Sequence, residues 1–135
     1  MNVLDAGPMI DYLTGEPGGD VIDDLLNDEE RDAPVYAHAL NLVEVFYHFS
    51  RLGDVLTARA VLATLEADGV IRRDDMGAAL CEDAAQLKTE WRRVSLADCF
   101  GLALARRENA SFYTTDHHEL DPLDAAGVCD FTFTR

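Results

Sequence analysis

The feature that most restricts the fold of this chain is its N-terminal stretch. Residues 1–4 form a short apolar run that ends in Asp5 and is followed at once by Gly7 and Pro8. An apolar run bounded by turn residues predicts a buried strand, and a strand that is apolar on both faces belongs in the middle of a parallel sheet. In open parallel sheets, ligands bind beyond the carboxyl ends of the strands, where the strand order reverses. Asp5 is therefore predicted to lie at a binding site.

The rest of the chain alternates short apolar runs with longer segments of helical periodicity. Further strands are expected at residues 34–37, 69–72, 112–115 and 130–133. Helices are expected at residues 8–13, 20–27, 39–51, 55–67, 76–91 and 95–109. Strands that alternate with helices indicate βαβ units, which build a parallel sheet with helices on both faces. We therefore expect one α/β domain that spans residues 1–135.

Composition narrows the classes of function. The chain has 26 acidic and 11 basic residues and a net charge of −15, so most of its surface should repel nucleic acid. Salt screens such repulsion over short distances, so the acidity does not exclude an RNA substrate. Three cysteines without a CxxC spacing predict reduced thiols, not a disulfide framework or a zinc site. Without a leader or an apolar run long enough to span a membrane, we expect a cytoplasmic protein.

Four acidic residues stand apart from the polar surface runs. Asp5 and Asp116 each follow an expected strand, at the carboxyl end. Glu44 and Asp98 lie in expected helices, among neighbours that are apolar or aromatic. A carboxylate in an apolar setting is costly unless it is hydrogen-bonded, paired or bound to a metal, and its oxygens suit Mg²⁺ or Mn²⁺. We interpret the four residues together as one metal site.

Three of these acids also have a purely structural interpretation. Ser95 and Asp98 have the spacing of a capping box at a helix start, with Asp in place of the usual Glu. Asp5 and Asp116 have the positions of turn-forming residues. Glu44 is different, because no Lys or Arg lies near it in sequence on its helical face. The metal-site interpretation therefore depends most on Glu44.

Other polar residues near these acids are weaker candidates. His117 and His118 are interpreted as polar loop residues in preference to ligands of a separate transition-metal site. Asp11 is interpreted as a solvated residue near the site. Two basic spots are candidates for contacts with backbone phosphates: Trp91 with Arg92 and Arg93, and the pair Arg106 and Arg107. Solvent-facing helix ends explain them equally well.

In the order and spacing of its motifs the chain resembles the PIN-domain ribonucleases, and among them the VapC-type toxins of prokaryotic toxin–antitoxin pairs. The matching segments are Val3-Leu4-Asp5, Asn41-Leu42-Val43-Glu44-Val45, Ser95-Leu96-Ala97-Asp98 and Tyr113-Thr114-Thr115-Asp116. The resemblance implies a three-layer α/β sandwich whose five-stranded parallel sheet has the order 3-2-1-4-5. It also implies a metal-dependent endoribonuclease, in which water activated by Mg²⁺ or Mn²⁺ cleaves RNA.

The same resemblance assigns roles to the four acids. Asp5, Glu44 and Asp98 are the expected inner ligands, and Asp116 is expected to bind a second metal ion or to orient water. Thr or Ser usually follows the first Asp in this family, whereas Ala6 stands there in this chain. The alternative is therefore a PIN-like domain that binds protein and no longer cuts RNA.

The resemblance and the sequence also imply protein partners. The resemblance implies a cognate antitoxin, whose C-terminal segment would cover the acidic site. The helical hairpin expected at residues 39–67 carries Leu, Phe and Tyr side chains that one small domain can hardly cover. Exposed apolar patches of this kind mark protein interfaces, so we expect a homodimer.

Overall fold

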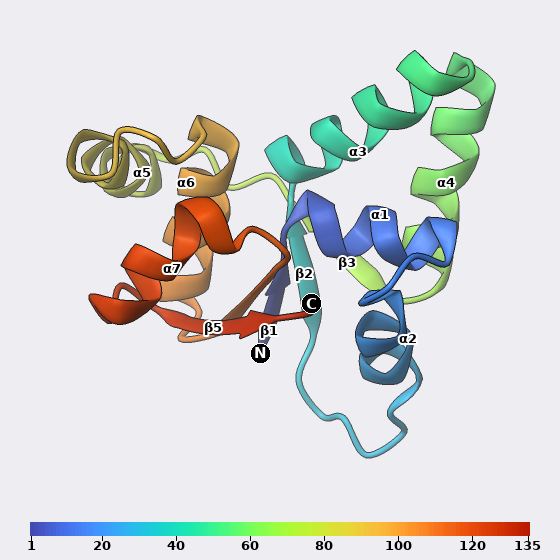
Figure 1. The fold of residues 1–135 in the computed structure, drawn as a ribbon, viewed down its shortest axis with the longest axis horizontal. Coiled ribbons are helices and arrows are strands. Elements are labelled where there is room, and N and C mark those ends of the chain that lie inside the picture. Colours follow the sequence, from blue (N-terminus) through green and yellow to red (C-terminus); the bar gives the residue numbers. More distant parts are fainter.

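The computed structural model describes residues 1–135 and contains five strands and seven helices (Figure 1). The strands are β1 (Asn2–Leu4), β2 (Val35–His38), β3 (Val70–Arg73), β4 (Ser111–Thr114) and β5 (Asp130–Phe133). The helices are α1 (Ala6–Thr14), α2 (Gly19–Asn27), α3 (Ala39–Leu52), α4 (Val55–Ala67), α5 (Ala78–Glu90), α6 (Leu96–Arg107) and α7 (His117–Ala125). None of the helices has both the length and the apolar character needed to cross a membrane.

The strands form a single sheet in which every neighbouring pair is parallel. Their order is β3-β2-β1-β4-β5, which confirms the order that the resemblance implied. β1 lies at the centre, with Val3 opposite Tyr36 of β2 and Phe112 of β4. The chain runs outward from β1 in one direction and then returns to start β4 on the other side. The strand order therefore reverses between β1 and β4.

Two hydrophobic cores cover the two faces of the sheet and make the fold three layers deep. Successive residues of β1 point to opposite faces, so Val3 belongs to one core and Leu4 to the other. The core around Val3 is built with residues of α5, α6 and α7, and the core around Leu4 with residues of α1 to α4. Figure 1 shows the same division, with α5, α6 and α7 on one side of the strands and α1 to α4 on the other.

The residues that begin three of the helices are polar and accept hydrogen bonds from the first turn. Asp5 caps α1, Ser95 caps α6 and Asp116 caps α7. Such capping satisfies backbone N–H groups that have no partner within the helix. Two of the four predicted site acids thus start helices at the carboxyl edge of the sheet.

Two sequence predictions about polar residues are wrong. Residues 117 and 118 begin α7 instead of forming a loop, because Asp116 caps the helix and Leu120 and Leu123 bury its inner face. Asp11 is buried, not solvated, and its carboxylate accepts a 3.0 Å hydrogen bond from Arg135. That partner lies at the far end of the sequence, so local sequence could not reveal the burial.

Candidate metal centre

The candidate site lies at the carboxyl edge of the sheet, beside the point where the strand order reverses. Asp5 follows β1, and its backbone N–H donates to the Tyr113 carbonyl of β4 at 2.9 Å. This bond continues the β1–β4 ladder by one residue and fixes where the Asp5 side chain leaves the sheet. The site therefore occupies the place that the N-terminal strand predicted.

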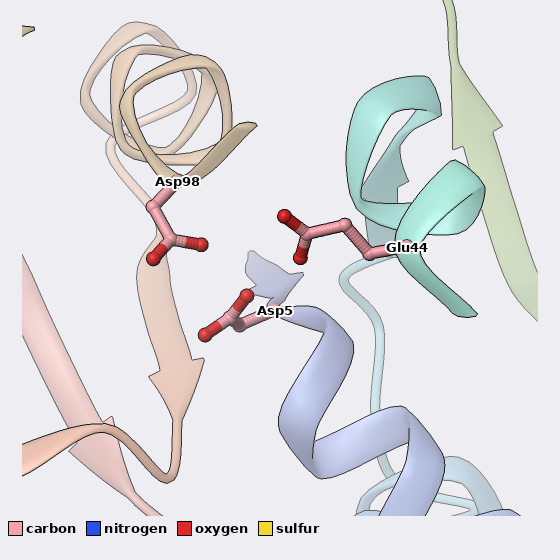
Figure 2. A group of neighbouring side chains, drawn as sticks. All are labelled: Asp5, Glu44 and Asp98. Carbon is pink, nitrogen blue, oxygen red and sulfur yellow. The ribbon is translucent and has the colours of Figure 1, made fainter. Parts of the chain in front are cut away.

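Three carboxylates from three different elements meet there. Asp5 comes from the junction of β1 and α1, Glu44 from α3, and Asp98 from the first turn of α6. Each offers a carboxylate oxygen, and these oxygens lie within 4.8 Å of one another. Figure 2 shows the three side chains pointing toward one another. Asp5 and Asp98 are 6% and 8% exposed, and Glu44 is half-buried, so water solvates the group only from one side.

No cation of the protein neutralises these three carboxylates. Every salt bridge in the structure involves other acids. Asp5 instead accepts neutral hydrogen bonds, from the Ala6 N–H at 2.7 Å and from the Thr114 hydroxyl at 2.8 Å. Three carboxylate groups that lie together without a positively charged side chain as partner fit a divalent cation of the Mg²⁺ or Mn²⁺ kind.

The electrostatics of the group follow from its burial and crowding. Burial is the main cause that raises the pKa of Asp98 to about 9, followed by the charge of Asp5 and a hydrogen bond with it. Burial also raises the pKa of Asp5, whose hydrogen bonds oppose the rise. The pKa of Glu44 is raised by burial and then by the charge of Asp5. Burial and crowding therefore favour the protonated form of these carboxylates, most strongly for Asp98.

Asp116 lies near this group without belonging to it. One of its carboxylate oxygens accepts a 3.0 Å hydrogen bond from the Glu119 N–H, as the cap of α7. Its own N–H donates to the Thr114 hydroxyl at 3.1 Å, the same hydroxyl that donates to Asp5. The charge of Asp116 contributes to the raised pKa of Asp5. The structure thus brings three of the four predicted acids together and leaves the fourth at the rim.

One half of the predicted capping box is present, with Ser95 as the cap of α6. The Ser95 hydroxyl oxygen accepts a 3.1 Å hydrogen bond from the Asp98 N–H at the start of α6. This turn points the Asp98 side chain at Asp5 and Glu44, so the cap and the carboxylate group use the same residue for two purposes. Asp5 also combines a capping role, at the start of α1, with membership of the carboxylate group, which is why local sequence patterns could not separate the two interpretations.

Thr114 is the residue at this edge whose contact with Asp5 sequence reasoning missed. Ala6 lacks the hydroxyl usual at its position, and no local sequence pattern shows which residue could replace it. In the structure the Thr114 side chain is fully buried and reaches back across the sheet edge to Asp5. The adjacent strand therefore supplies a hydroxyl that Ala6 cannot, and only the pairing of β1 with β4 makes this possible.

Comparison with known proteins identifies the family. The model of the PIN domain matches residues 3–124, which is most of the chain. The chain belongs to the PIN domain family. No curated protein sequence matches it, so the assignment depends on the family model and on the fold.

Solved structures similar to this PIN domain come from several bacteria. A toxin–antitoxin complex from Klebsiella pneumoniae aligns with a TM-score of 0.69 at 15% identity, over 100% of this chain and 98% of that one. VapC20 of Mycobacterium tuberculosis, described as a sarcin–ricin loop cleaving toxin, aligns with a TM-score of 0.68 at 19% identity, over 94% and 95% of the two chains. VapBC-1 from nontypeable Haemophilus influenzae aligns with a TM-score of 0.70 at 14% identity, over 98% and 97%. At these identities the likeness establishes the shared fold.

Proposed function

We propose that this PIN domain is a metal-dependent endoribonuclease and the toxin of a toxin–antitoxin pair. The observation that carries the proposal is the group of Asp5, Glu44 and Asp98, three desolvated carboxylates at a topological switch point with no protein cation to neutralise them. Buried like charges are unfavourable unless a ligand compensates them, so the geometry favours a cation-binding site over a structural cluster.

In this proposal the three carboxylates hold Mg²⁺ or Mn²⁺. A bound divalent cation supplies Lewis acidity, which lowers the pKa of water and offsets the charge that develops on the phosphoryl oxygens. The residues of the chain position it. The hydrogen bonds from Ala6 and Thr114 hold the Asp5 carboxylate in one orientation, and the capped first turn of α6 orients Asp98. A cation held by Asp5 and Asp98 would favour the charged form of both carboxylates.

Asp116 is proposed to act from the rim. Its oxygen Oδ1 is engaged by Glu119, whereas Oδ2 has no partner in the protein and remains available. From this position the carboxylate can orient the attacking water or hold a second cation. Replacement by Asn distinguishes the two, because loss of a second cation lowers the number of Mn²⁺ ions bound and loss of an orienting group does not.

A cavity of about 390 Å³ between the end of α5 and α7 is the proposed place for the RNA backbone. Its lining includes Glu119, whose N–H donates to Asp116. Its walls include Trp91, Arg92 and Arg93, just before α6, and His118 of α7. Both arginines are exposed and neither forms a salt bridge, although the chain has more than twice as many acids as bases. Unpaired arginines with an aromatic neighbour suit phosphate and base contacts.

Substitution tests this assignment directly. Replacing both Arg92 and Arg93 with Ala should raise the KM for RNA several-fold while Mn²⁺ binding and thermal stability stay unchanged. The matched control replaces Arg51 and Arg59 of the α3–α4 hairpin with Ala. It removes the same amount of charge from residues that do not line this cavity. Equal KM values for the two double variants would contradict the assignment.

The α3–α4 hairpin is the proposed surface for protein partners. Its exposed apolar side chains are Val43, Tyr47, Leu52, Val55 and Leu56. Several of the structures with this fold are complexes of a toxin with its antitoxin, which supports an antitoxin partner here. We propose that the hairpin contributes to a homodimer and that a cognate antitoxin binds over it and blocks the carboxylate group.

The decisive experiment is RNA cleavage by the purified protein with Mg²⁺ or Mn²⁺ and with a chelator. The proposal predicts cleavage that needs the metal, that is abolished by Asp98→Asn and that the antitoxin inhibits. A protein that binds its antitoxin but cuts no RNA under any metal condition would instead be the protein-binding module suggested by Ala6.

A further inference from the structure

Asn41 is a buried amide that joins the two helices carrying Glu44 and Asp98. It lies in α3, one turn before Glu44, and its side chain is fully buried. Its Nδ2 donates to the Ala97 carbonyl of α6 at 3.4 Å, next to Asp98 in the chain. Its Oδ1 is buried and has no hydrogen-bond partner. A single side chain thus connects the backbone beside one ligand to the helical turn before another.

Gly101 allows the two helices to approach at this point. A Cβ on Gly101 would lie 2.9 Å from Asn41 Nδ2 and 2.7 Å from Cε1 of Phe112 on β4. The Phe112 ring is fully buried in the core between the sheet and α6. Any larger residue at this position would push α6 away from α3 and from the sheet. The close approach therefore depends on Gly101 and Asn41 together.

Packing alone does not account for the amide. A buried acceptor without a donor lowers stability, and a Leu of similar shape would fill the same space without that cost. The one hydrogen bond that Asn41 makes is directed at the turn that carries Asp98. Residues that are unfavourable for stability in this way commonly serve a site.

We propose that Asn41 is a positioning residue for the metal centre. Seated against Gly101, it sets the distance between the Glu44 and Asp98 carboxylates so that both can reach one cation. The inference rests on the proposed metal site and adds to it a residue that touches neither cation nor RNA. Because Mg²⁺-like ions need oxygens at about 2.1 Å in near-ideal geometry, a small change in helix spacing weakens their binding.

The test is calorimetric titration of the metal-free proteins with Mn²⁺, together with thermal unfolding in chelator. Asn41→Leu should unfold in chelator at the parent temperature or above it, because the unpartnered amide is gone. Its Kd for Mn²⁺ should rise about tenfold or more, as for other residues that orient metal ligands. Asn41→Ala, which leaves space in place of bulk, should be less stable and show the same rise in Kd.

The matched control is Leu65→Ala, in the core on the α4 side. Leu65 is 1% exposed, so its truncation should lower the unfolding temperature while the Kd for Mn²⁺ stays at the parent value. If the parent binds Mn²⁺ and both Asn41 variants bind it equally well, this inference is overturned and the metal site stands. If the parent binds no Mn²⁺, the metal site fails and the inference fails with it.

Discussion

Replacing Asp98 with Asn should make the metal-free protein more stable. In the folded protein the pKa of Asp98 is raised from 3.8 to about 9, so at pH 7 folding forces a proton onto the group that the unfolded chain releases. Each pH unit between 3.8 and 7 costs about 1.4 kcal/mol. The upper limit is therefore about 4 kcal/mol, and Asn carries no such cost. Since its amide must still find partners, we expect a gain of about 2 to 4 kcal/mol.

The pH dependence of this gain follows from the direction of the pKa shift. A raised pKa means that the native state binds more protons than the unfolded state between pH 3.8 and about 9, so the stability of the parent falls as pH rises through that window. The Asp98→Asn variant lacks the contribution of Asp98 to this pH dependence of stability. The difference in unfolding free energy between the two proteins should therefore grow from pH 5 to pH 8.

Metal should act in the opposite direction. At a Mn²⁺ concentration of about 100 times Kd, the parent gains about 2.7 kcal/mol, and a variant without one ligand gains much less. The assay is urea and thermal unfolding of both proteins at several pH values, with chelator and with excess Mn²⁺. A gain of 1 kcal/mol corresponds to roughly 4 °C in Tm for a chain of this length.

A matched variant controls for the general relief of negative charge. Asp83→Asn also removes one charge, from an exposed position on α5, and should change stability little under any condition. If Asp98 served only in the capping turn of α6, its replacement would cost up to about 1 kcal/mol with or without metal. Equal Mn²⁺ shifts in parent and Asp98→Asn, or a less stable metal-free variant, would refute the shared-site reasoning.

Three further predictions concern the surroundings of the site and the proposed interface. Thr114→Val removes the hydroxyl that donates to Asp5, so it should lower the unfolding free energy by about 1 to 3 kcal/mol in urea and weaken Mn²⁺ binding. An unchanged Kd for Mn²⁺ would show that the hydroxyl is irrelevant to the metal. Gly7→Ala places a Cβ against the Thr115 hydroxyl, which can rotate away, and should cost no more than about 1 kcal/mol. The added Thr115→Ala change should remove this cost, and a cost that persists would refute the steric explanation. Leu56→Asp, at a side chain that is 70% exposed, should leave the unfolding temperature unchanged and shift the protein toward monomer in light scattering, whereas an unaltered oligomer would place the interface elsewhere.

Short patterns in the sequence predicted most of the helices and strands. They also showed which acidic residues were unusual. Short apolar runs that end at Asp5 and Asp116 indicated strands, because a run of this kind bounded by turn residues is typical of a buried strand. Glu44 stood out because a carboxylate on an apolar helical face needs compensation. These signals are local, and each can be read from a few residues. The resemblance to a family then supplied the strand order, which no local pattern contains.

The tertiary structure decided how these residues are used. The burial of Asp11 depends on Arg135, and the orientation of Asp5 depends on Thr114, both more than 100 residues away in the chain. The sequence analysis missed α7 altogether, because its polar first turn and Pro122 are typical of a loop until Leu120 and Leu123 are buried in a core.

The carboxylate group shows the same division most clearly. Sequence identified Asp5, Glu44 and Asp98 one by one. Their common position, the separate position of Asp116 and the raised pKa of Asp98 follow from helix packing on a sheet. The pKa of a carboxylate depends on what surrounds it in space, and the neighbours that raise it come from three separate elements. The contact between Asn41 and Gly101 was also decided by the tertiary structure, because the sequence of one helix alone does not show where it approaches another.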